Sequence, residues 1–261
     1  MSASTVTVDR KGSVSIITMC RPETFNTLSL ELAMDLLAAA LTCARDPHTR
    51  AVVLTGTGKS FCFGGDLKAM SSKGNSVGPL MREVVSYMNS AISQFMRMDA
   101  PVIAAVNGTA AGAGVGFALM ADLIVAGQSS KFNLAYTGVG LTPDAGVTYL
   151  LPRTIGVKRT MEMLLLNPSL SAEKALEWGL INRVVPDEDL LSEAMKLAEQ
   201  LAAGPLRAFG MSKRLVAQSL GALETQLAVE GETIARQAAT PEGQEGIAAF
   251  LNKRKPNFSG G

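Results

Sequence analysis

Two glycine-rich segments and one isolated aspartate could together stabilise a negative charge on an oxygen and move a proton beside it. The segments read SFCFGGDL at residues 60–67 and NGTAAGAGVGF at residues 107–117, and each follows an apolar, strand-like run. Backbone N–H groups in such turns can converge on one oxygen, and preorganised donors of this kind stabilise an oxyanion. Close packing of a helix on a sheet is the alternative role for either turn.

The aspartate is Asp144, in the loop LTPDAGVTY at residues 141–149. Its nearest charged neighbours in the sequence are Lys131 and Arg153. A carboxylate in an apolar pocket has a raised proton affinity, which suits it to take a proton from carbon and return it elsewhere. The alternative is that Asp144 only caps the helix that follows it.

The rest of the sequence offers little support for other chemistries. His48 is the only histidine and stands in a polar turn, so a serine–histidine or cysteine–histidine nucleophile is disfavoured. The cysteines lack metal-ligand spacing, and no metal site is expected. The segment TGTGKS at residues 55–60 is not a P-loop, because Val53 stands where the first glycine is needed. A net charge of +1 gives no field for binding nucleic acid or an anionic membrane.

The hydrophobic patterns predict an α/β fold. Strands are expected at residues 5–8, 14–19, 51–55, 102–106 and 123–126, with helices over residues 28–44 and 84–96 between them. This alternation predicts right-handed crossovers and stacked, mostly parallel sheets. After about residue 150 helical periodicity dominates, interrupted by a turn at residues 179–186. We therefore expect an α/β core over residues 1–200 and a helical region over residues 201–261 that packs on neighbouring subunits.

Several features favour a cytoplasmic protein. The uncharged stretch at residues 108–121 is too short to span a membrane and is expected to be a buried helix. The first residues lack the basic and apolar regions of a signal peptide. Cys20, Cys43 and Cys62 lie in apolar segments and suggest a reduced, intracellular protein without disulfides.

The chain resembles the crotonase (enoyl-CoA hydratase/isomerase) superfamily over nearly its whole length. The matching segments are RPETFN at residues 21–26, the two glycine-rich turns, WGL at residues 178–180 and FLNKRKPNF at residues 250–258. The resemblance implies the crotonase fold, with stacked, mostly parallel sheets in ββα repeats and a helical carboxyl-terminal region. It also implies an acyl-CoA thioester substrate, no cofactor apart from the coenzyme A of the substrate, and a homotrimer or dimer of trimers.

The resemblance further implies roles for individual residues. The oxyanion donors would be the N–H groups of Phe63 and Ala113, although the family usually has alanine at position 63. Ala113 is expected where a helix begins, so the helix dipole would add partial positive charge there. The remaining substrate-binding residues expected on this basis are Asp66, Gly112, Gly114, Tyr136, Lys253 and Lys255. Among these, Asp66 would fix the first turn, and the two lysines would contact a phosphate of coenzyme A.

The departures from the family pattern point to one branch of it. The hydratases it resembles carry two glutamates, and Gly116 and Tyr136 occupy those positions here. Asp144 instead matches the aspartate of the ring-1,2-epoxyphenylacetyl-CoA isomerases, which also shift enoyl-CoA double bonds. The dehalogenases share this aspartate but pair it with a histidine and a tryptophan, where this chain has Asn89 and Tyr136. We therefore expect an acyl-CoA isomerase with Asp144 as the proton shuttle. The alternatives are an unusual enoyl-CoA hydratase and a non-catalytic acyl-CoA-binding scaffold.

Overall fold

The larger of two β-sheets forms the centre of the molecule. The computed structural model describes residues 4–220 and 223–257. In spatial order the sheet contains β1 (Val6–Lys11), β2 (Val14–Met19), β3 (Ala51–Gly56), β5 (Val102–Val106), β7 (Leu123–Gly127) and β10 (Arg183–Val185). β1 and β2 form an antiparallel hairpin, and every other neighbouring pair is parallel.

A smaller sheet lies beside it and carries the glycine-rich turns. Its strands are β4 (Ser60–Cys62), β6 (Thr109–Ala111), β8 (Lys131–Asn133) and β9 (Leu170–Ser171), and only the β8–β9 pair is antiparallel. Consecutive strands are divided between the two sheets: β3, β5 and β7 lie in the large sheet, and the strands that follow them, β4, β6 and β8, lie in the small one. Helical structure follows each of these pairs. This pattern confirms the predicted stacked, mostly parallel sheets in ββα repeats.

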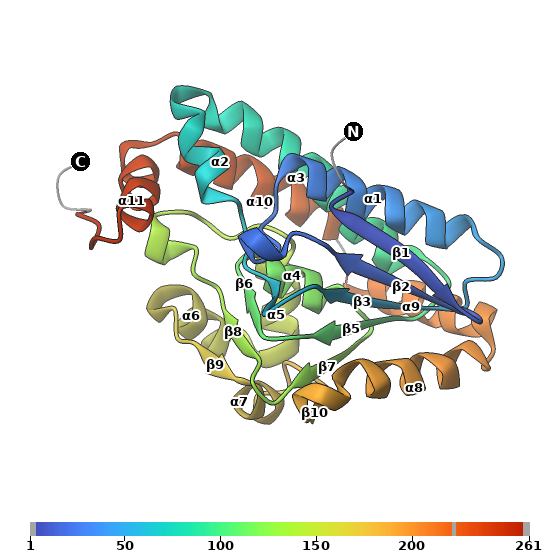
Figure 1. The fold of residues 1–261 in the computed structure, drawn as a ribbon. Coiled ribbons are helices and arrows are strands. Elements are labelled where there is room, and N and C mark those ends of the chain that lie inside the picture. Colours follow the sequence, from blue (N-terminus) through green and yellow to red (C-terminus); the bar gives the residue numbers. More distant parts are fainter. Residues whose placement is uncertain (1–3, 221–222, 258–261) are drawn as a thin grey trace.

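Helices cover both faces of the large sheet (Figure 1). On one face, α1 (Leu30–Arg45) packs on α3 (Val77–Arg97) over the inward side chains of β2, β3 and β5. α8 (Leu190–Ala202) covers the other face, where Leu190 and Leu197 join the cluster that contains Val53 and Ile103. The remaining helices are α2 (Leu67–Ser72), α4 (Ala113–Leu119), α5 (Val147–Ile155), α6 (Val157–Leu166), α7 (Ala172–Glu177), α9 (Leu206–Leu220), α10 (Leu223–Ala238) and α11 (Pro241–Leu251).

Three sequence-based expectations differ from the structure. Residues 108–121 are not one helix, because β6 precedes α4. The expected turn at residues 179–186 contains β10, which pairs with β7 and ends the large sheet. α10, in the region expected to pack on neighbouring subunits, packs on α3 of its own chain, so this face is not left for a neighbouring subunit.

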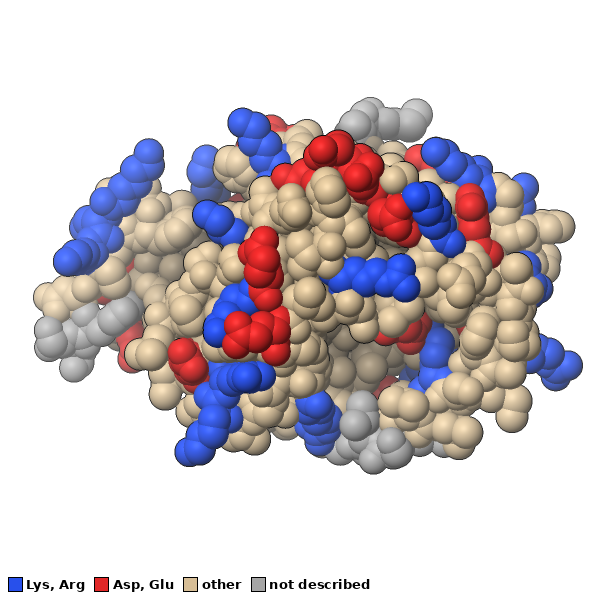
Figure 2. Space-filling view, turned by 90° about the horizontal axis from the view of Figure 1, so that it is seen from below, with Lys and Arg blue, Asp and Glu red and all other residues tan. Residues whose placement is uncertain are grey.

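The surface has a mixed charge, and no described helix is long and apolar enough to cross a membrane. On the face shown in Figure 2, basic and acidic side chains are interspersed among uncharged residues. This distribution agrees with the net charge of +1 for the whole sequence.

Candidate active site

A cavity of about 620 Å³ lies where the two glycine-rich turns meet the carboxyl-terminal helices. Gly64, Gly65 and Gly112 contribute backbone to its lining, and Asp144 and Tyr136 contribute polar side chains. Much of the remaining lining is apolar and comes from distant parts of the chain, including Leu80, Met81 and Val84 of α3, Ile234 of α10, and Phe250 and Leu251 of α11. The helical region therefore helps to build the cavity of its own chain.

Asp144 is a buried carboxylate at this cavity, with a relative exposure of 4%. Its Oδ1 accepts a hydrogen bond of 2.6 Å from the hydroxyl group of Tyr136. The pKa of Asp144 is raised to about 7, with burial as the largest cause. The hydrogen bond from Tyr136 opposes this rise, and the nearby charge of Glu230 adds to it. The alternative role as a helix cap is wrong, because α5 begins after Gly146 without a side-chain cap. A carboxylate with a pKa near neutrality is suited to accept and return a proton.

The two positions at which related hydratases carry glutamates are occupied by groups that cannot act as bases. A Cβ atom on Gly116 would lie 2.5 Å from both the Cβ atom and the carbonyl oxygen of Ala145, so the Asp144 loop packs directly on α4 at this point. Tyr136 is buried, and burial together with the charge of Asp144 raises its pKa well above its usual value. Its hydroxyl group is therefore a hydrogen-bond donor to Asp144, not a second base.

The hydrogen bonds of the first glycine-rich turn do not support Phe63 as an oxyanion donor. The Phe63 N–H already donates to the carbonyl oxygen of Phe25 at 3.1 Å. The two aromatic rings also pack together, with their centroids 5.8 Å apart, and both side chains are exposed at the cavity. No local pattern indicates the hydrogen bond of the Phe63 N–H, because its acceptor, Phe25, is distant in the sequence.

Two other N–H groups are free to bind an oxygen at this place. Among the residues that the structure describes, neither the N–H of Gly65 nor that of Ala113 donates a hydrogen bond. Ala113 opens α4 directly after Gly112, which lines the cavity. The turns approach each other closely, because a Cβ on Gly64 would meet the Ala111 carbonyl oxygen at 2.9 Å. Gly65 was missed by the sequence analysis, although it stands immediately before Asp66.

The other two glycines assigned to substrate binding have different surroundings. Gly112 lines the cavity and has a φ angle of +51°, which favours glycine, but its N–H donates to the Asn133 carbonyl oxygen. Gly114 does not line the cavity. A Cβ atom at this position would lie 2.1 Å from the carbonyl oxygen of Cys62, so Gly114 permits α4 to pack against β4.

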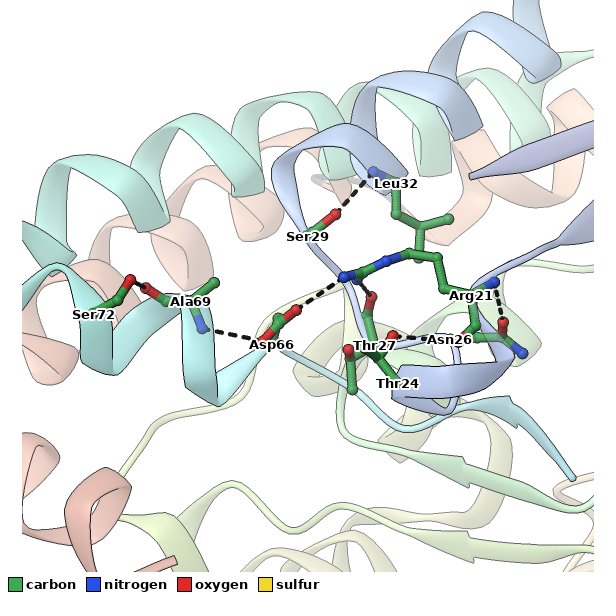
Figure 3. Close-up of polar contacts among 9 residues, drawn as sticks. All are labelled: Arg21, Thr24, Asn26, Thr27, Ser29, Leu32, Asp66, Ala69 and Ser72. Carbon is green, nitrogen blue, oxygen red and sulfur yellow. Dashed lines mark hydrogen bonds and ion pairs between the residues drawn. The ribbon is translucent and has the colours of Figure 1, made fainter. Parts of the chain in front are cut away.

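Asp66 fixes the first turn through an ion pair and a helix cap (Figure 3). Its Oδ2 lies 3.2 Å from Nη2 of Arg21, and its Oδ1 accepts a hydrogen bond from the N–H of Ala69 at the start of α2. Asn26 lies in the same segment as Arg21. Its amide group donates to the carbonyl oxygen of Ser60, and its Oδ1 accepts a hydrogen bond from the N–H of Arg21. These contacts join residues 21–26 to the turn, as the sequence analysis expected of Asp66.

The basic residues at the cavity differ from those expected. Lys253 and Lys255 follow α11, are exposed and do not line the cavity. Lys68 of α2 and Lys131 of β8 do line it, and both are exposed at its edge. Neither was singled out from the sequence, since isolated lysines on polar segments carry no distinguishing pattern.

Comparison with known proteins agrees with this geometry. Residues 9–261 match the model of the family described as enoyl-CoA hydratase/isomerase. The chain belongs to the enoyl-CoA hydratase/isomerase family. It is 39% identical over 249 residues to the 1,2-epoxyphenylacetyl-CoA isomerase of Escherichia coli K12, covering 95% of each chain. It is 40% identical to a probable enoyl-CoA hydratase of Rhodobacter capsulatus, covering 100% of both chains.

The fold agrees with solved structures of this family. A crystal structure of an enoyl-CoA hydratase from Mycobacterium avium subsp. paratuberculosis K-10 superimposes with a TM-score of 0.88 at 31% identity, covering 98% of each chain. The protein is thus a crotonase-fold member of a family of acyl-CoA-processing enzymes. Its similar relatives bear the names of both isomerases and hydratases, so these names do not distinguish the two reactions.

Proposed function

We propose that this family member is an acyl-CoA isomerase that uses Asp144 as its only proton-transferring carboxylate. Its substrate would be an enoyl-CoA thioester or a ring-epoxide thioester. The buried Asp144, at the cavity that Gly65 and Gly112 also line, carries this proposal. The other acidic residues of the lining are less suited to be bases, because Glu23 is exposed and Asp66 is paired with Arg21.

The proposed reaction for a 3-enoyl-CoA has two proton transfers. The N–H groups of Gly65 and Ala113 hold the thioester oxygen, and Asp144 takes a proton from C2. The C2–H bond breaks, and its electrons form a dienolate whose negative charge is stabilised on that oxygen. Asp144 then returns the proton to C4, so the double bond moves from C3–C4 to C2–C3. One carboxylate is sufficient, and no water is consumed.

The described residues of the lining offer no second base, which favours isomerisation over hydration. Hydration needs a group that activates water, and Gly116 has no room for a side chain, while Tyr136 is already committed to Asp144. The relative named as a probable hydratase keeps hydration as the second candidate. Coenzyme A would enter as part of the substrate, with Lys68 and Lys131 available to its phosphates and no separate cofactor.

The proposed reaction, in which Asp144 alone moves a proton from C2 to C4 of the same substrate molecule, can be tested by isotope labelling. When 3-enoyl-CoA is converted to 2-enoyl-CoA in deuterated water, we expect incomplete deuterium incorporation at C4, because buried Asp144 returns part of the original hydrogen before exchange. Mass spectrometry at low conversion measures this fraction. Complete incorporation from the first turnovers would contradict a proton shuttle shielded from solvent.

We also propose that the protein assembles as a trimer or a dimer of trimers. The described surface retains exposed apolar side chains on α6, at Val157, Met161 and Leu165, and on α9, at Met211 and Leu215. Their burial between subunits would remove apolar area from water. Sedimentation equilibrium at micromolar concentration should give three or six times the chain mass of 27.3 kDa. A stable monomer would refute the proposed assembly.

A further inference from the structure

A second buried carboxylate, Glu230, lies behind the loop that carries Asp144. Glu230 belongs to α10 and has a relative exposure of 3%. Within the described residues no basic side chain forms an ion pair with it. A buried carboxylate without such a partner is costly unless other donors satisfy it. The hydrogen-bond donors that surround Glu230 therefore decide whether its carboxylate can be buried here.

Glu230 accepts hydrogen bonds from the segment immediately after Asp144, and the side chain of Gln226 on its own helix also interacts with it. Its Oε2 accepts a hydrogen bond of 2.6 Å from the N–H of Gly146, and its Oε1 accepts one of 2.9 Å from the N–H of Thr148. The Thr148 hydroxyl group also donates to Oε1, while it accepts a hydrogen bond from Gln226. Burial raises the pKa of Glu230, whereas these hydrogen bonds lower it. Donors on both carboxylate oxygens match the ionised form, which can only accept.

The segment held in this way has an unusual backbone conformation. Ala145 and Gly146 both have positive φ angles, of +55° and +73°, and a left-handed alanine is unfavourable without support. Glu230 binds the N–H group of Gly146 itself and that of Thr148, two residues further on. Loss of its contacts would let the loop relax and move the Asp144 carboxylate.

The charge of Glu230 also acts on Asp144 directly. Three ionisable groups face Asp144 in the described structure, each from a different part of the fold. Tyr136 donates a hydrogen bond and lowers the pKa of Asp144, whereas Glu230 raises it. The Cys62 thiol on β4 has a pKa raised to about 12 by burial and is neutral at physiological pH. Glu230 is thus the group that opposes ionisation of Asp144 through its charge.

We infer that Glu230, which lies outside the cavity, is a positioning residue that holds the Asp144 loop through Gly146 and Thr148 and places a negative charge behind the proposed base. This inference rests on the proposed isomerase function. It assigns the helical carboxyl-terminal region a part in the chemistry besides assembly and lining of the cavity. It also explains why the apolar spacing of Leu227 and Ile234 on α10 is interrupted by a glutamate.

The substitution Glu230→Gln tests both parts of the inference, with Glu232→Gln as the matched control. Glu232 is on the same helix but is only half-buried and is paired with Arg82. In Glu230→Gln the acidic limb of the kcat/KM profile should move to lower pH by about half a unit or more, because a negative charge near Asp144 is removed. The kcat should fall by about tenfold or more, because the carboxylate is less well placed, with little change in KM.

Glu232→Gln should leave the pH profile, kcat and KM unchanged. An unchanged profile and kcat in Glu230→Gln, or equal changes in both variants, would overturn the inference. If Glu230→Gln does not fold, Glu230→Asp keeps the charge but shortens the side chain. It should lower kcat by about tenfold while the acidic limb stays near its wild-type position, and a wild-type kcat would count against the positioning role.

A measurement without substrate separates this inference from the proposed function. The ionisation of Asp144 can be followed by carbon NMR of its carboxyl group in the wild-type protein and in Glu230→Gln. A lower pKa in the variant supports the inference even if the proposed isomerase activity is absent. Equal pKa values in the two proteins would refute the electrostatic effect.

Discussion

Asp144→Asn should lower the turnover of 3-enoyl-CoA by about 10²–10⁴-fold, which is the usual contribution of a general base. The amide has nearly the same shape and can still accept the hydrogen bond that Tyr136 donates to Oδ1. It cannot take a proton from carbon. Substrate affinity should change little, since Asp144 contributes chemistry and not most of the cavity surface. Steady-state kinetics at pH 8 measures the loss, and near-normal turnover would refute the assignment.

The stability of this variant provides the folding control. The folded protein holds the Asp144 proton up to about pH 7, whereas an unfolded chain releases it near the usual aspartate pKa of 3.8. Ionised Asp144 therefore destabilises the wild-type fold, and this cost appears as the pH rises through that window. At pH 8 Asp144→Asn should gain stability on the order of a few kcal/mol, with no such gain at pH 4. A folded, more stable and inactive variant is the expected combination.

Ala113→Pro should lower kcat by about 10²–10³-fold, the typical effect of removing one oxyanion donor. Proline lacks the backbone N–H but is well tolerated at the first position of a helix, which Ala113 occupies in α4. The preceding Gly112 has no side chain to clash with the proline ring. The substitution therefore removes the donor with little change to the helix.

Ala113→Gly is the matched control for this experiment, because it loses the methyl group but keeps the N–H. It should retain kcat within about tenfold of the wild type, because it removes only one buried methyl group and costs about 1 kcal/mol in helix propensity. Thermal unfolding of both variants checks that the fold is intact. Equal kcat values for folded Ala113→Pro and Ala113→Gly would exclude the Ala113 N–H as an oxyanion donor.

The fold could be predicted from the sequence where local pattern determines structure. The apolar runs at β3, β5 and β7 and the periodicity of α1 and α8 gave elements close to those observed. The short strands of the small sheet were not predicted, because two or three residues carry too little periodicity to be recognised. β10 also has only three residues, and its pattern does not distinguish it from a turn.

The candidate site was predictable only in part, because its details depend on contacts between distant segments. Asp144 stood out as an isolated charge in an apolar loop, and the structure places it at the cavity. The choice between Phe63 and Gly65 depends on the carbonyl oxygen of Phe25, which no local pattern in the turn reveals. Glu230 was missed, although a glutamate within the apolar stripe of α10 is a signal that a helical projection would show.

The relative rates of isomerisation and hydration, measured with the same enzyme preparation, test the central claim most directly. Purified wild-type protein and Asp144→Asn would each be given 3-enoyl-CoA and 2-enoyl-CoA of the same chain length. We predict that the wild-type protein isomerises the first rapidly and hydrates the second slowly or not at all, and that Asp144→Asn does neither. Hydration comparable with isomerisation in the wild type, and lost in Asp144→Asn, would show that Asp144 activates water and would contradict the proposed reaction.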